Sequence, residues 1–351
     1  MTRIAVAMAT YQGERYLERQ LASIAAQTRP PEALYVRDDA STDGTVELLK
    51  HFAASAPFPV HIAVSENHLG VTLNFERVID DVGYDGDVIV LSDQDDVWLP
   101  LKLAHLEAVF AGSPRTTMAF SDAYLIDADG NRSGVRRWAL PGFGAAHQRE
   151  LRHDPFAQLM SHYIVSGCML AFRNDRRDLF LPFPAELQFA DSDMHVLHDK
   201  WLAIVMALAG DVEVIAEPLL EYRIHPNQTI GVAPRSLLRK ALPPWLRWQL
   251  VAYRARRQPA YLAGMLTLLH IMRGRADESL GGPQRLEALH DIDEAILHLQ
   301  ARSGFAGSRA RRVPGVIRET RAGRYNRYSF GPASAVVDVF RPQAHPHGHQ
   351  P

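Results

Sequence analysis

The sequence has a single cysteine, Cys168, among its 351 residues. One thiol cannot form a disulfide within the chain, which excludes a secreted scaffold held together by disulfides. The longest late apolar run, residues 260–272, is interrupted by Gly264, Thr267 and His270. It is shorter than the ~20 residues that cross a bilayer. Internal repeats and a recognisable signal peptide are also absent. We therefore expect the protein in the cytosol, with peripheral association at the inner membrane face as a further expectation.

Net charge is small, but charge is unevenly distributed. The formal net charge is −2, and the 47% hydrophobic and 22% charged residues are ordinary for a globular protein. Residues 1–234 carry 19 Lys and Arg against 32 Asp and Glu, whereas residues 235–351 carry 19 against 8. Such asymmetry indicates a partner for the basic part. The alternative is a solvated arginine-rich surface that balances the acidic part.

Short apolar runs alternate with helical patterns in the first third of the chain. The predicted strands are residues 4–8, 34–36, 60–64 and 88–91, and the predicted helices include residues 16–24, 45–52 and 74–79. Strands that alternate with helices predict parallel βαβ units and therefore an α/β fold. The pattern is more mixed over residues 113–234. Apolar residues at helical spacing then predict a basic helical extension over 235–340, followed by a disordered tail over 341–351.

Polar clusters directly follow three of the predicted strands. Thr10 and Tyr11 follow the first strand, Asp38 and Asp39 follow the second, and Asp-Gln-Asp-Asp at residues 93–96 follows the fourth. Open α/β sheets bind ligands in the crevice outside the carboxyl ends of their strands. We therefore expect these segments to meet at one site, although they are far apart in the sequence.

The carboxylates of residues 93–96 are the strongest chemical signal. Three carboxylates within four residues repel one another unless a cation or hydrogen bonds offset their charge. Mg²⁺ is typically held by one or two carboxylates together with substrate phosphates. The alternative is an acidic turn that caps the helix that follows.

Asp39 and Tyr11 suit recognition of a nucleobase. An ionised carboxylate only accepts hydrogen bonds, so it selects a base with a ring N–H, which means uracil, thymine or guanine. Tyr11 offers a flat face on which such a base can stack. The alternative is a turn stabilised by its Asp and Ser side chains.

Two later segments carry further candidates. Asp199 precedes a helical run; it is ionised at neutral pH and can accept a proton, or it can simply serve as the N-cap of that helix. Residues 222–227 combine a cation, an imidazole and a turn, a combination that predicts little by itself.

Taken together, these motifs resemble glycosyltransferase family 2. The nucleotide-binding half of that family is matched by residues 8–14 (MATYQGE), 16–24, 38–45 (DDASTDGT), 67–70 (NHLG) and 92–98 (SDQDDVW). The version Asp-Gln-Asp-Asp-Val-Trp resembles the bacterial rhamnosyltransferase-like branch. The acceptor half of that branch is matched by residues 166–172 (SGCMLAF), 198–201 (HDKW) and 222–227 (YRIHPN). The resemblance spans about residues 1–231.

The resemblance implies a GT-A fold, an α/β architecture with a doubly wound, mostly parallel sheet and here a C-terminal helical extension. Residues 1–112 would form the nucleotide-sugar-binding half and residues 113–234 the acceptor-binding and catalytic half. The implied catalytic base is Asp199. The implied nucleotide-binding residues are Thr10, Tyr11, Asp39 and Asp93; the metal ligands are Asp93, Asp95 and His225; and the acceptor-side residues are Gly167, His198, Trp201 and Arg223. Trp201 would either pack against an acceptor sugar or lie in the core.

The resemblance also implies an activity. It is that of an inverting, Mg²⁺- or Mn²⁺-dependent glycosyltransferase that uses a dTDP, UDP or GDP sugar, with rhamnose favoured by the branch. The acceptor would be a saccharide, either free or linked to a lipid, and the reaction would belong to surface polysaccharide synthesis. No nucleic acid is expected as a partner. A sugar-phosphate nucleotidyltransferase is one alternative, but residues 10–14 lack the basic, glycine-rich loop that it needs. A non-catalytic glycan-binding protein of the same fold is the other.

The basic C-terminal region is predicted to contact a membrane surface peripherally. Trp245 and Trp248 beside Arg247 suit an interfacial segment, and basic residues are attracted to an anionic leaflet. The alternative is that this region packs on the catalytic part or forms an oligomer contact.

Overall fold

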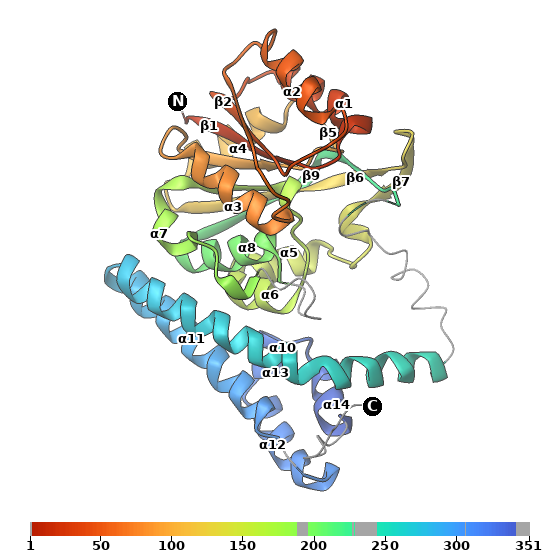
Figure 1. Ribbon diagram of the computed structural model, residues 1–351. Coiled ribbons are helices and arrows are strands. Elements are labelled where there is room, and N and C mark those ends of the chain that lie inside the picture. The colour runs from red at the N-terminus through yellow and green to blue at the C-terminus, as the bar shows by residue number, and fades with distance from the viewer. Residues whose placement is uncertain (1, 188–195, 227, 229–243, 306, 342–351) are drawn as a thin grey trace. The chain divides into compact units, whose positions relative to one another are not determined.

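The computed structural model describes residues 2–187, 196–226, 228, 244–305 and 307–341, without the side chains of residues 244–259 (Figure 1). The chain divides into two compact units. The first comprises Met1–Leu159, Tyr163–Gln188 and Val196–Pro234; the second comprises Met160–His162, Phe189–His195 and Arg235–Pro351. The finer division of the sequence into four parts stays a prediction.

The first unit is built on one nine-stranded sheet with the order β3-β2-β1-β4-β8-β6-β9-β5, and β7 pairs with β6. Its first half alternates strand and helix, as the sequence predicts. The elements are β1 (Ile4–Thr10), α1 (Glu14–Ala25), β2 (Ala33–Asp38), α2 (Thr45–Ala53), β3 (Val60–Val64), α3 (Val71–Val82) and β4 (Val88–Ser92). All neighbours among these four strands are parallel, which confirms the predicted βαβ units.

The strand order explains why helices cover both faces of this half. The chain moves from β1 through β2 to β3 in one direction and then returns from β3 to β4 beside β1. Because crossovers between parallel strands are right-handed, α1 and α2 lie on one face and α3 on the other. Every residue of β1 and of β4 is buried, as expected for strands covered on both faces.

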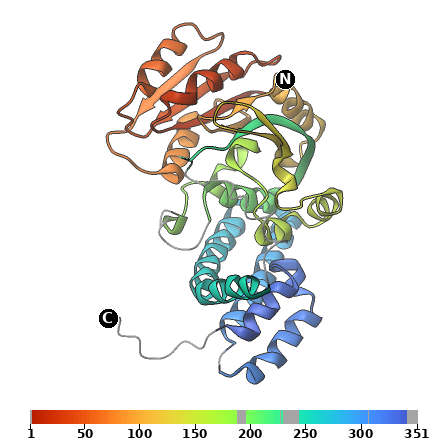
Figure 2. The ribbon, with the colours of Figure 1, turned by 90° about the vertical axis from the view of Figure 1, so that its right-hand side faces the viewer.

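The second half of the sheet is mixed. Its strands are β5 (Val97–Trp98), β6 (Thr116–Ile126), β7 (Arg132–Arg136), β8 (Leu170–Arg173) and β9 (Asp211–Arg223). The α-helices are α4 (Lys102–Gly112), α5 (Ala145–His153), α6 (Pro155–Ser161), α7 (Arg177–Phe180) and α8 (His198–Ala209), and the 3-10 turns are η1 (Arg137–Ala139), η2 (Gly167–Met169), η3 (Asn174–Arg176) and η4 (Ala185–Leu187). β8 is antiparallel to β4 and β6, whereas the long pair β6–β9 is parallel. The longer pairings are therefore parallel, as predicted, and Figure 2 shows both halves joined in one twisted layer.

The described part of the second unit is helical. Its helices are α10 (Pro244–Ser279), α11 (Gly282–Ser303), α12 (Arg309–Arg321), α13 (Arg324–Tyr328) and α14 (Pro332–Phe340). α10 and α11 pack on each other and bury apolar residues that recur at helical spacing, among them Leu262, Met265, Leu269, Ile292 and Leu299. The predicted C-terminal helical extension is confirmed over these residues.

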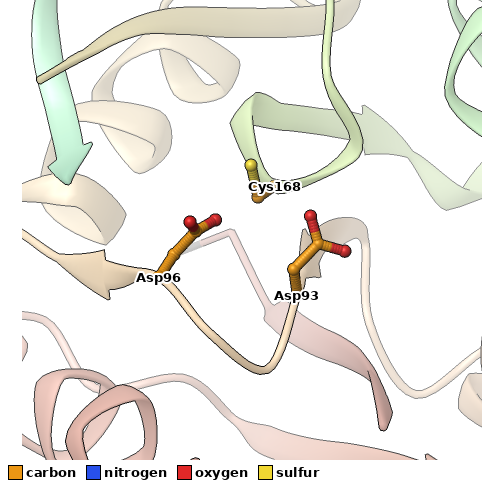
Figure 3. A group of neighbouring side chains, drawn as sticks. All are labelled: Asp93, Asp96 and Cys168. Carbon is orange, nitrogen blue, oxygen red and sulfur yellow. The ribbon is translucent and has the colours of Figure 1, made fainter. Parts of the chain in front are cut away.

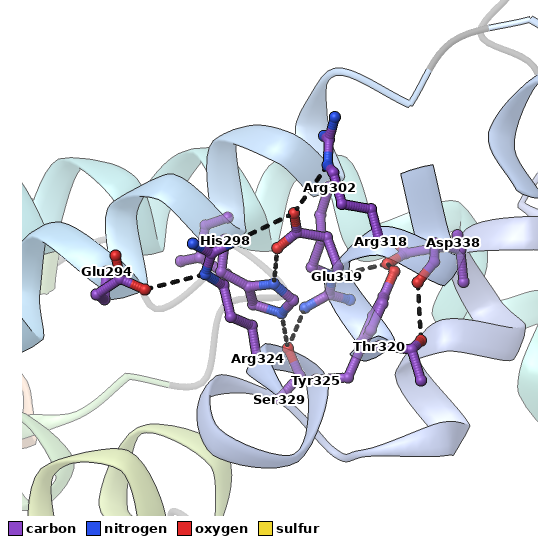
Figure 4. A network of polar contacts seen from close by, with 12 residues as sticks. Glu294, His298, Arg302, Arg318, Glu319, Thr320, Arg324, Tyr325, Ser329 and Asp338 are labelled. Atoms are coloured by element: carbon purple, nitrogen blue, oxygen red, sulfur yellow. Dashed lines mark hydrogen bonds and ion pairs between the residues drawn. The ribbon is translucent and has the colours of Figure 1, made fainter. Parts of the chain in front are cut away.

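A buried polar network joins the helices of this unit (Figure 4). His298 on α11 lies 3.0 Å from Glu319 through Nδ1 and 3.0 Å from the Ser329 hydroxyl through Nε2. The Arg302 guanidinium donates to Asp338 at 2.8 Å. Charged groups removed from water are costly unless they are paired, and here each group named has a partner.

This network predicts acid sensitivity of the helical unit. Burial lowers the pKa of His298 from 6.5 to about 4, so the imidazole is neutral in the fold. The unfolded chain then binds the proton more tightly than the folded chain. We expect stability to be constant above pH ~6.5 and to fall by about 3 kcal/mol as the pH drops to ~4.

An NMR titration of the histidine rings measures this pKa directly. Chemical denaturation of wild type and His298→Gln should show a stability difference that shrinks over the same pH range. A His298 ring that titrates near pH 6.5 in the folded protein would contradict the prediction.

Candidate active site

The carboxyl ends of β1, β2 and β4 meet at one edge of the sheet, as the sequence predicts. Thr10 at the end of β1 is paired in register with Asp38 at the end of β2. The Gln94 side chain, in the loop after β4, accepts from the Tyr11 backbone N–H and donates to the Tyr11 carbonyl, both at 2.8 Å. A Cβ at Gly13 would overlap this amide, so a side chain there would displace Gln94 from Tyr11.

Gln94 is a residue that the sequence did not single out. It stands between Asp93 and Asp95, whose carboxylates are predicted metal ligands, whereas an amide side chain does not by itself indicate a function. Its role follows only from the approach of two loops that lie 83 residues apart in the chain. The structure thus assigns it to holding the Tyr11 turn.

Asp38 and Thr10 form the buried support of the site. The Thr10 hydroxyl donates to Asp38 Oδ2 at 2.8 Å, and the Ser41 backbone N–H donates to Asp38 Oδ1 at 2.8 Å. Both Thr10 and Asp38 are buried. The Thr10 side chain is therefore engaged with β2, and a direct contact of Thr10 with a nucleotide stays a prediction.

Asp39 and Tyr11 lie together, with His68 between them. Asp39 is almost fully buried, and its carboxylate accepts from the backbone N–H groups of Leu69 at 2.7 Å and Gly70 at 2.8 Å. His68 Nδ1 lies 2.8 Å from Asp39 Oδ2, and the Tyr11 ring lies over the His68 ring with centroids 4.1 Å apart. His68 lies in the matched segment 67–70, but no role was predicted for it, because its contacts depend on how the loop after β3 folds back.

The loop after β4 concentrates negative charge. Donor atoms of Asp93, Asp96 and Cys168 all lie within 4.8 Å of one another, and Figure 3 shows both carboxylates on one loop facing the cysteine. Burial, followed by repulsion from Asp96 and Asp95, raises the pKa of Asp93 well above its usual value. Burial and the Asp95 charge raise the pKa of Asp96 to about 7. Such a cluster favours a bound cation, which would offset this repulsion.

Asp95 meets His225, which follows β9. His225 Nε2 lies 2.8 Å from Asp95 Oδ2. Arg223 holds the two segments together, because its backbone N–H donates to Asp96 Oδ1 at 3.0 Å and its Nε donates to the Asp95 carbonyl at 2.7 Å. Residues 130 positions apart are thus brought into contact, and their role as metal ligands stays a prediction.

These donors fit a divalent cation such as Mg²⁺ or Mn²⁺. Carboxylate oxygens are hard ligands that suit both ions. Within the described residues, Asp96 Oδ2 is buried and has no hydrogen-bond partner. A buried oxygen without a donor is a group that a cation or an ordered water can satisfy.

Asp199 lies in the first turn of α8 and is buried. Its Oδ1 accepts from the Tyr163 hydroxyl at 2.5 Å and from the Lys200 backbone N–H at 2.7 Å. The N-cap of α8 is Leu197, so Asp199 is not the cap that the sequence offered as the alternative. The charge of Asp199 contributes to the raised pKa of Asp93, which puts the two carboxylates in the same electrostatic environment.

The remaining acceptor-side candidates surround the start of α8. The buried His198 ring stacks on Phe75 with centroids 4.1 Å apart, and burial lowers its pKa. A Cβ at Gly167 would lie 2.8 Å from His198 Nε2, so this glycine makes room for the imidazole. Trp201 is fully buried and donates from Nε1 to the Phe180 carbonyl at 3.0 Å. Of its two alternatives, the core position is therefore the one observed, and Trp201 is not free to contact a sugar.

Comparison with known proteins identifies the family. Residues 5–178 match glycosyl transferase family 2. The dTDP-rhamnosyl transferase RfbG of Shigella flexneri is 41% identical over 229 residues, which cover 64% of this chain and 73% of RfbG. The chain belongs to glycosyltransferase family 2. The predicted family is thereby confirmed.

A second relative and a solved structure are similar to this chain at lower identity. The uncharacterised protein Rv1520 of Mycobacterium tuberculosis is 28% identical over 218 residues, and the matched part spans 57% of its length. The crystal structure of S. aureus TarS 1-349 in complex with UDP has a TM-score of 0.54 at 13% identity, and the match covers 96% of this chain and 90% of that chain. That likeness establishes the GT-A fold, as predicted, and nothing beyond the fold.

Proposed function

We propose that this glycosyltransferase transfers a sugar, with inversion, from a nucleoside-diphosphate sugar to a saccharide acceptor, and that the donor is dTDP-rhamnose. The observation that carries the proposal is the meeting of Asp95 and His225 beside the base-binding candidates Tyr11 and Asp39. The choice of rhamnose is supported by the 41% identity to a dTDP-rhamnosyl transferase. A role in surface polysaccharide synthesis belongs to the same proposal.

Asp199 supplies the general base of the proposed reaction. Its carboxylate takes the proton from an acceptor hydroxyl as that oxygen attacks the anomeric carbon, and the bond to the diphosphate oxygen breaks on the opposite face. The Tyr163 hydroxyl, at 2.5 Å, holds the carboxylate in place. A cation held by Asp95 and His225, with Asp93 beside them, would neutralise charge on the leaving diphosphate. Arg223 keeps the ligand-bearing segments together.

A panel of nucleotide sugars tests this function. We expect release of nucleoside diphosphate from dTDP-rhamnose. Among the other donors, only UDP and GDP sugars could react, because the Asp39 carboxylate requires a ring N–H on the base. Equal turnover of an ADP sugar would contradict base selection by Asp39. Binding of glycans without release of diphosphate would favour the non-catalytic alternative, and formation of a nucleotide sugar from a sugar phosphate would favour the nucleotidyltransferase.

We also propose peripheral contact with an anionic membrane, where a lipid-linked acceptor would lie. Within the described residues, none of the helices has a stretch apolar and long enough to cross a bilayer. The side chains of Trp245, Arg247 and Trp248 lie outside the description. The support comes from α12, where four arginines and two apolar residues are exposed: Arg309, Arg311, Arg318, Arg321, Val313 and Ile317. Exposed arginines interspersed with apolar side chains suit an anionic leaflet.

Flotation with vesicles of anionic phosphatidylglycerol tests this contact. The double variant Arg311→Gln/Arg321→Gln is expected to bind about thirtyfold more weakly, at ~1 kcal/mol per arginine, and added salt should release the wild type. Arg15→Gln/Arg149→Gln, which removes two exposed arginines of the first unit, is the matched control. A full-length chain that ignores such vesicles at low salt would show that the region is structural.

A further inference from the structure

The base-binding candidates are already in contact with a side chain of the protein itself. We propose that the His68 imidazole occupies the place of the donor's nucleobase and must be displaced when the nucleotide binds. This inference rests on the proposed function. It concerns one residue that sets nucleotide affinity.

The first observation is the hydrogen bond to Asp39. His68 Nδ1 lies 2.8 Å from Asp39 Oδ2, and a buried carboxylate is an acceptor only, so this nitrogen carries the proton. A ring N–H of uracil, thymine or guanine would have to reach the same carboxylate. The imidazole N–H therefore already makes the interaction on which base selection depends.

The second observation is the ring contact with Tyr11. The Tyr11 and His68 rings are 4.1 Å apart between centroids and inclined by 31°. Stacking on Tyr11 is the other interaction expected of the base. One imidazole thus makes both the polar and the stacking contact of a nucleobase, from a flat ring that presents an N–H at its edge.

The third observation is that His68 can leave without disturbing Asp39. The His68 side chain is 54% exposed, whereas that of Asp39 is 2% exposed. After His68 rotates away, the backbone N–H groups of Leu69 and Gly70 still hold the carboxylate at 2.7 and 2.8 Å. Gly70 has φ +87°, a conformation that side chains disfavour, so this anchoring turn depends on glycine. The carboxylate is fixed and the imidazole is the displaceable partner.

Once a base has displaced His68, selectivity depends on Asp39. A base with a ring N–H replaces the hydrogen bond that the imidazole gives up. Adenine or cytosine offers a ring acceptor there, so it leaves Asp39 without that donor and places two acceptors face to face. Because a buried charged group that loses its donor is costly, Asp39 discriminates against the wrong base, whereas displacement of His68 lowers the apparent affinity for every base by the same factor.

Calorimetry of UDP, dTDP and ADP binding to the full-length chain tests the proposal. Removing a competitor that occupies most of the population raises apparent affinity by the inverse of the free fraction, so we expect His68→Ala to bind UDP and dTDP about three- to tenfold more tightly. ADP should gain by the same factor, because its binding also requires displacement. His51→Ala, an exposed histidine on α2, is the matched control and should leave all affinities unchanged. Magnesium pyrophosphate, which lacks a base, should bind wild type and His68→Ala equally.

The outcomes separate this proposal from the function on which it rests. Weaker binding of UDP and dTDP to His68→Ala would overturn it and make His68 a direct base contact, and unchanged binding would overturn it as well. An equal gain for pyrophosphate would assign the effect to the phosphate region and also overturn it. If no nucleoside diphosphate binds even the wild type, the proposed function itself fails.

Discussion

Turnover of the Asp95→Asn variant is expected to be at least a thousandfold lower than that of the wild type. Asp95 contacts His225 at 2.8 Å, and the pair is the proposed anchor of the cation. Stabilisation of a leaving diphosphate by a metal contributes several kcal/mol, and each 1.36 kcal/mol corresponds to a factor of ten in rate. The measurement is diphosphate release at saturating donor, with the fold checked by circular dichroism.

Chelation provides the same test without a mutation. Excess EDTA should abolish wild-type turnover, and added Mg²⁺ or Mn²⁺ should restore it. Asp178→Asn removes an exposed carboxylate from α7 and serves as the matched control, with turnover near that of the wild type. Full activity in excess chelator would contradict the metal-dependent mechanism.

The second large effect is expected at Asp199. Asp199→Asn keeps the size of the side chain but removes the proton acceptor, so turnover should fall by about 10²- to 10⁴-fold, the usual contribution of a general base. Affinity for the nucleoside diphosphate should remain that of the wild type, because Asp199 acts on the acceptor. Tyr163→Phe removes only the hydrogen bond at 2.5 Å that orients the carboxylate, and its loss of turnover should be smaller.

Two measurements distinguish this role from a structural one. Single-turnover kinetics at saturating donor and acceptor isolate the chemical step, which should be the step that slows. If Asp199→Asn instead loses affinity for the nucleotide while its single-turnover rate is preserved, Asp199 belongs to the donor site and the base must be sought elsewhere.

The sequence predicted the first four strands of the sheet and the edge at which the site forms, because both follow from local patterns. β1 and β4 are continuous apolar runs, and the polar residues that end them can only lie at the carboxyl edge. The pairing of Asp95 with His225 was accessible only through the family resemblance, since no local pattern relates positions 130 residues apart.

Two features of the site could not be predicted from the sequence, for physical reasons. All twelve residues of α8 are buried, so no polar stripe shows which way Trp201 faces. Gln94 and His68 act through hydrogen bonds between loops, and their partners depend on the backbone path of both loops. Amphipathic periodicity reports burial and cannot report such contacts.

The Gln94 amide forms hydrogen bonds with both the N–H and the carbonyl of Tyr11, and this has a consequence for the binding of two ligands at once. It ties the loop that carries Asp93 and Asp95 to the turn that carries the stacking ring. Any ordering of one loop by its own ligand then lowers the cost of ordering the other. Cation and nucleobase should therefore bind cooperatively, and thermodynamic linkage requires that each strengthen the other by the same factor.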